Sequence, residues 1–185
     1  MQQLIRELIP HAPQMRLYVA PNIPENKLQN ALGDYANSLS ADQVLALFDA
    51  TLMGSAKDGI LFTAEGIRFQ NNPMEPAQEV RYTDIVEVKT KRKLVGGQKV
   101  HLLVNRGRAT MDVQLDCSVK PEAAKFIARF LNEALLLGAA REMEGTLKLT
   151  AAGSDRKTVE KALRVLVDQG VLVESDLNAM LEAIR

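Results

Sequence analysis

The stretch GILFTAEGIRFQ, residues 59–70, decides the fold of this chain. Its first half places Ile60 and Phe62 on one side of an extended backbone, and its second half, IRF, repeats the alternation. Side chains alternate across a strand with a period of two, so the pattern predicts two neighbouring strands. Between them, Gly66 is expected to take the positive φ of a tight turn. The stretch therefore predicts an antiparallel β-hairpin.

Extended segments with short turns continue on both sides of this hairpin. Apolar residues follow a period of two, or a pattern that allows it, at residues 44–48, 80–90, 100–104 and 109–115. Residues 44–48 fit either a helical turn or a strand buried on both faces, because consecutive positions are apolar. Consecutive strands joined by short turns, such as Gly96-Gly97, pair antiparallel, since parallel pairing needs long crossovers.

Helical spacing surrounds this β region. It predicts short helices before Pro10 and over residues 28–35, then a strong amphipathic helix that opens at Pro121 and stops at Gly138. Two more short helices are expected in the last thirty residues. The sequence predicts three parts, listed here with their bounds: 1–39, an N-terminal helical segment; 40–141, the β region with its closing helix; 142–185, a linker and a helical hairpin.

The middle part resembles the bacterial pleckstrin-homology-like domain families. The resemblance rests on Phe48-Asp49, on the turn GSAKDG at 54–59 with the following ILFT, and on Glu65-Gly66-Ile67. It covers about residues 40–141, and it departs from the family pattern at Arg68, where an aromatic residue is common. It implies an α+β fold, an antiparallel barrel closed by an amphipathic helix. It implies a binding or assembly scaffold and carries over no catalytic residue.

Composition describes an ordinary globular chain of 185 residues. Apolar residues make up 46% and charged residues 25%, and 23 basic side chains balance 23 acidic ones. No apolar stretch approaches the roughly 20 residues that span a bilayer, and the N-terminus does not have the pattern of a signal peptide. The single cysteine, Cys117, cannot form an internal disulfide. We therefore expect a cytoplasmic protein, and the family resemblance implies a bacterial one.

Residues that could carry chemistry are few. His11 and His101 lie about ninety positions apart, and no zinc-ligand spacing, phosphate loop or nucleophile motif is present. His101 is expected to be an ordinary strand side chain, and Cys117 a small buried hydrophobe. We expect no enzyme, no metal and no cofactor.

Charge placement indicates one candidate site. Between Arg81 and Arg108 there are eight basic residues against Asp84 and Glu87 alone. The candidate anion-binding residues are Lys89, Lys91, Arg92 and Lys93. Such a strip could meet the phosphates of an anionic membrane or of a nucleic acid, or it could be a solvated strand edge that prevents pairing with other molecules.

The tail offers a second candidate site. It resembles the short C-terminal helical hairpins that promote oligomerisation of bacterial proteins, and it must dock on its own chain or on another copy, because two short helices are not stable alone. The candidate self-association residues are Leu163, Leu166, Leu177 and Leu181. The tail is also similar to a winged-helix recognition helix, which would put Arg156, Lys157 and Lys161 on DNA phosphates.

The sequence thus favours a non-catalytic binding or assembly module that contacts a protein partner or itself. The alternatives are a nucleic-acid-binding regulator and a peripheral protein of anionic membranes.

Overall fold

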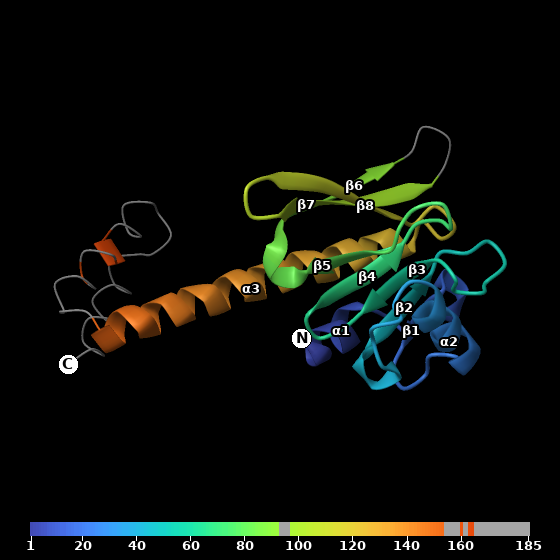
Figure 1. Cartoon of the computed structure of the whole chain (residues 1–185), viewed down its shortest axis with the longest axis horizontal. Helices are drawn as coiled ribbons and strands as arrows, with labels where there is room; N and C mark the ends of the chain where they lie inside the picture. Colours follow the sequence, from blue (N-terminus) through green and yellow to red (C-terminus); the bar gives the residue numbers. More distant parts are fainter. Residues whose placement is uncertain (93–96, 154–159, 161–162, 165–185) are drawn as a thin grey trace. The chain divides into compact units, whose positions relative to one another are not determined.

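The computed structural model describes residues 1–92, 97–153, 160 and 163–164. The chain divides into two compact units, Met1–Gly138 and Ala139–Arg185. The first unit holds both the expected N-terminal segment and the expected β region (Figure 1). Among the described residues, no helix has the length and apolar character needed to cross a membrane.

The strands of the first unit form two antiparallel sheets. The first sheet has the order β1-β2-β3-β4-β5, and the second has the order β6-β7-β8. The strand bounds are β1 Leu17–Val19, β2 Ala46–Asp49, β3 Gly59–Phe62, β4 Gly66–Gln70, β5 Gln78–Arg81, β6 Ile85–Arg92, β7 Gln98–Asn105 and β8 Thr110–Asp116. The fold is therefore mixed α+β with antiparallel sheets, as predicted, and the described strands lie in two separate sheets.

The predicted hairpin is present, but its glycine has another reason to be there. In the register of β3 and β4, Phe62 lies opposite Ile67. Gly66 does not have the positive φ that the sequence suggested. A Cβ at this position would lie 2.3 Å from the carbonyl oxygen of Val80 in β5. Close approach of the neighbouring strand, and not the turn, excludes a side chain here.

Two segments that the sequence predicts to have one kind of secondary structure throughout do not have it in the structure. The extended stretch predicted over residues 80–90 is split by a 3₁₀ turn, Tyr82–Asp84, which separates β5 from β6 and lets them join different sheets. The N-terminal segment is not wholly helical, because Leu17–Val19 form β1 and pair with β2. Three residues are too few to show a period, so the sequence pattern could not reveal this strand.

Three α-helices and two further 3₁₀ turns complete the described chain. Their bounds are α1 Gln2–Leu8, η1 Pro13–Met15, α2 Glu25–Asp34, η2 Ala41–Gln43 and α3 Ala123–Gly153. A capping box is present at η2, where the Ser40 amide donates to the Gln43 side chain at 2.9 Å. Helix α3 does not stop at Gly138 as expected. A glycine inside a helix costs only about 1 kcal/mol, which the flanking helix formers outweigh.

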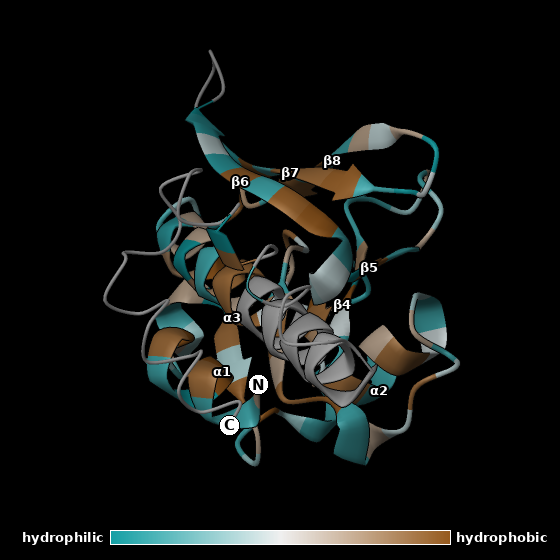
Figure 2. Ribbon diagram, turned by 90° about the vertical axis from the view of Figure 1, so that its left-hand side faces the viewer, coloured by the Kyte–Doolittle hydropathy of each residue, from teal (hydrophilic) through white to brown (hydrophobic). Residues whose placement is uncertain are grey.

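The core of the first unit has two clusters. The larger lies between the sheets, α1 and α3, and Phe130 of α3 makes edge contacts with Phe62 and Tyr82 at 5.6 and 5.5 Å between ring centroids. The smaller lies where residues of α2 meet the other face of β2 and β3. Figure 2 shows hydrophobic residues on the strands and helices around these clusters. Strand β2 is thus buried on both faces, one of the two arrangements that residues 44–48 allowed.

Candidate binding surface

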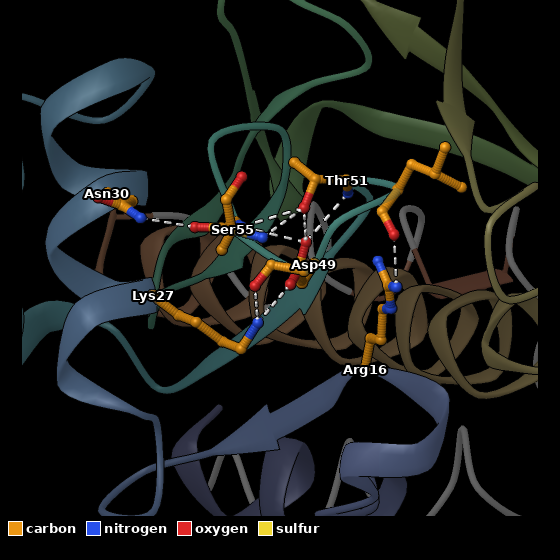
Figure 3. Close-up of polar contacts among 9 residues, drawn as sticks. Arg16, Lys27, Asn30, Asp49, Thr51 and Ser55 are labelled. Carbon is orange, nitrogen blue, oxygen red and sulfur yellow. Dashed lines mark hydrogen bonds and ion pairs between the residues drawn. The ribbon is translucent and has the colours of Figure 1, made fainter.

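The β2–β3 loop is held by a buried carboxylate at its start. Asp49, the last residue of β2, is fully buried and pairs with Lys27 of α2 at 2.6 Å (Figure 3). Its other oxygen accepts hydrogen bonds from the Thr51 amide at 3.0 Å, the Thr51 hydroxyl at 2.5 Å and the Ala56 amide at 3.1 Å. One carboxylate therefore fixes both ends of the loop and ties it to a helix.

Three further contacts fix the middle of the loop. The Lys27 ammonium also donates to the carbonyl oxygen of Gly54. Asn30 of α2 donates to the carbonyl oxygen of Ser55 at 2.8 Å, and the Arg16 guanidinium donates to that of Leu52 at 2.8 Å (Figure 3). The backbone of the loop is thus bonded from α2 on one side and from the residue before β1 on the other.

The tip of this anchored loop carries apolar side chains in solvent. Leu52 is 80% exposed and Met53 is 90% exposed. A loop that is disordered can expose such residues at random, but this backbone is fixed by the contacts described above. The two side chains are therefore presented to solvent from a defined place.

A second loop presents a third apolar side chain. In the β4–β5 loop, Met74 is 97% exposed, and its amide donates to the Asn72 side chain at 2.9 Å. Asn72 also donates to Glu75 at 2.7 Å. Asn71, at the start of the loop, donates to the carbonyl oxygen of Gln114 at 2.8 Å and accepts from the Asp116 amide at 2.9 Å. These bonds attach the loop to the end of β8.

The two loops and the end of the second sheet lie at the same end of the unit. Connections alternate between the ends of an antiparallel sheet, so the β2–β3 and β4–β5 loops leave from one end. Asn71 joins that end to Asp116, which lies opposite Lys99, and Lys99 lies opposite Lys91 of β6. Figure 1 shows these connections on its right-hand side. We call this end the loop face, defined by Leu52, Met53, Lys57, Met74, Lys91 and Arg92.

Three of the four residues of the predicted basic strip are described, and two of these three have no carboxylate partner among the described residues. Lys89, Lys91 and Arg92 are exposed on β6, whereas Lys93 lies outside the described residues. Lys89 pairs with Glu87 on its own strand at 2.7 Å. Within the described part of the chain, no carboxylate pairs with Lys91 or Arg92. The free part of the strip is therefore its end on the loop face.

The two histidines and the cysteine lie apart from one another, and each histidine already has a polar contact. The His11 ring accepts from the Val19 amide at 3.2 Å, and His101 on β7 contacts Asp112 at 3.1 Å. Burial, with a smaller effect of the Asp116 charge, raises the pKa of the Cys117 thiol to about 12. Among the residues that the structure describes, no three metal-ligating side chains come together. An open pocket of about 240 Å³ lies beside the β3–β4 hairpin, at the other end of the first sheet, and includes the paired Arg68 and Glu79.

The tail residues are mostly outside the described part of the chain. Leu163 is described and is 1% exposed. The remaining self-association candidates Leu166, Leu177 and Leu181, and the DNA-contact candidates Arg156, Lys157 and Lys161, lie outside the described residues. Predictions about these six residues stay predictions.

Sequence reasoning identified Lys91 and Arg92 of the loop face but missed its apolar residues. Leu52 and Met53 stand between Thr51 and Gly54, and Met74 stands close after Pro73. Large apolar residues inside turn-forming sequence are the available signal, because core residues belong to periodic segments.

Comparisons with protein-family models, with curated proteins and with solved structures found no match to this chain.

Proposed function

We propose that this chain is a non-catalytic binding module with a pleckstrin-homology-like core, and that it docks on its partner through the loop face. Two antiparallel sheets followed by a long helix support the core assignment. So does the GSAKDG turn, which stands between β2 and β3. Binding residues concentrate on loops that a rigid scaffold positions.

One observation carries the proposal: three large apolar side chains stand in solvent on loops whose backbones are bonded in place. Their exposure of 80–97% gives them almost no part in the core. Leu52 and Met53 are adjacent on one loop and Met74 lies at the same end of the unit, so the three offer apolar surface to a partner. A fixed backbone reduces the entropy that is lost on binding, so the loops are suited to docking without rearrangement.

The magnitudes indicate weak, reversible docking. Fully burying three such side chains contributes roughly 5–9 kcal/mol, at about 1.5–3 kcal/mol each. Association itself costs about 4–15 kcal/mol of lost freedom. The apolar tips alone therefore hold a partner poorly, and the basic residues of the loop face must add attraction.

Site-specific crosslinking in the producing cell tests this function. A photoreactive phenylalanine derivative placed at position 53 should form covalent adducts with a partner. The same residue at position 109, exposed in the β7–β8 turn, is the matched control and should form none. Equal adduct yields at the two positions, or no adduct at position 53, would contradict docking through the loop face.

Self-association is a second candidate, favoured by α3. Up to Gly138, the part of this helix whose side chains are described, the last buried residue is Ala134, and beyond it Leu136 and Leu137 are 61% and 41% exposed. If two copies cover these residues, the apolar gain is about 1 kcal/mol per leucine, so the dimer is weak.

Light scattering of the full chain near millimolar concentration tests the dimer. We expect a mass above that of one chain, and a return to one chain in Leu136→Gln/Leu137→Gln, which keeps helix propensity. Val86→Ser/Met111→Ser removes two other half-exposed apolar residues and should leave the mass unchanged. A monomer mass at every concentration would exclude this candidate.

A further inference from the structure

We propose that the partner of the loop face is an anionic lipid bilayer, into whose interface Leu52, Met53 and Met74 insert while Lys57, Lys91 and Arg92 meet lipid phosphates. This inference rests on the proposed function and names the class of its partner. The apolar and basic members of the loop face are all exposed.

The shape of the loop face favours a fluid, flat surface over a folded protein. The three apolar side chains come from two separate loops and protrude into solvent, and the pocket described above lies at the other end of the first sheet. A protein partner needs a matched cavity for each protruding side chain. Acyl chains adapt to any such shape, so separate protruding tips insert without complementary sites.

The charges beside the tips also favour anionic lipid. Lys57 shares the β2–β3 loop with Leu52 and Met53 and is exposed. Lys91 and Arg92 have no carboxylate partner among the described residues. Basic side chains close to an anionic bilayer surface attract it, and long side chains keep their charge in the headgroup layer while apolar neighbours enter the interface.

The two loops and the strand end before them carry three acidic residues, Asp49, Asp58 and Glu75, of which the first two are buried. Asp49 is buried and paired with Lys27, and Glu75 accepts hydrogen bonds from Asn71 and Asn72. Of these three, only Glu75 is exposed, so one negative charge at the lipid surface opposes three cations.

Sedimentation of the full chain with unilamellar vesicles tests the inference. Vesicles of phosphatidylcholine and phosphatidylglycerol in equal parts should bind the protein, and pure phosphatidylcholine vesicles should bind it at least tenfold more weakly. Added salt should weaken binding, because it screens exposed charges. Equal binding to both vesicles, or none to either, would overturn the inference.

Variants separate the two contributions. Leu52→Ser/Met53→Ser/Met74→Ser should lower vesicle affinity at least tenfold. Lys57→Gln/Lys91→Gln/Arg92→Gln should lower it about a hundredfold, at roughly fivefold per cation. Val86→Ser/Met111→Ser is the matched control with exposed apolar residues outside the loop face. All are surface changes that leave the fold intact, which thermal melting checks. A control variant that loses as much as the loop-face variants would also overturn the inference.

Failure of this inference differs from failure of the proposed function. If position 53 crosslinks to a protein in the cell while vesicles bind nothing, the loop face docks on protein and the lipid inference is wrong. If position 53 forms no adduct with protein or with lipid, the proposed function itself fails.

Discussion

Asp49→Ala lowers the free energy of unfolding by about 3–5 kcal/mol, the effect of removing one partner of a buried ion pair. The Lys27 side chain is only 14% exposed, so the substitution leaves a poorly solvated ammonium without its carboxylate. The amides of Thr51 and Ala56 lose their acceptor as well. Urea denaturation of the two proteins measures the difference.

An exposed ion pair is the matched control. Glu79→Ala removes the partner of Arg68, at a contact of 2.7 Å where the Glu79 side chain is 50% exposed. This change should cost under about 1 kcal/mol, because solvent screens the pair. Asp49→Asn, which keeps an acceptor but loses the charge, should fall between the two. If Asp49→Ala costs no more than Glu79→Ala, the loop is not held by this carboxylate.

Strands β3 and β4 were predictable because their pattern is local. Ile60, Phe62 and Phe69 alternate within a few residues of the turn, and antiparallel pairing follows from short connections. The second buried face of β2 could only be offered as one of two readings. It depends on α2, whose Ala31 and Tyr35 pack against that face, and docking between segments leaves no period in the sequence.

The candidate site was less predictable, for a physical reason. Asp49 lies in the stretch that carries the family resemblance, yet its burial depends on Lys27, 22 residues earlier in the chain. Leu47 and Leu52 are the same residue type five positions apart, and the first is buried while the second is 80% exposed. Residue type sets the gain from burial, but only tertiary structure decides which leucine is buried.

The basic run shows the same distinction. Its residues could be counted from the sequence, whereas the pairing of Lys89 with Glu87 required the structure. Among the described residues of the strip, Lys89 has a carboxylate partner, whereas Lys91 and Arg92 at the loop end of β6 have none.

Gly59→Ala is expected to destabilise the chain by about 4 kcal/mol, the sum of backbone strain and overpacking. Gly59 has a φ of +153° and lies opposite Asp49 in the β2–β3 register. A Cβ there would lie 2.1 Å from the carbonyl oxygen of Phe48 and 3.3 Å from the amide nitrogen of Ala50. Both atoms belong to the backbone, so relief requires the strand itself to move.

Gly107→Ala separates the strain from the clash. Gly107 also has a positive φ, +82°, but a Cβ at this position has no atom within 4 Å. This variant should lose only about 1–2 kcal/mol, the cost of a left-handed conformation. Thermal and urea unfolding of the two variants should therefore differ by about 2 kcal/mol or more. Equal losses would mean that β2 moves freely at Phe48, which contradicts a strand that is buried on both faces and bonded on both edges.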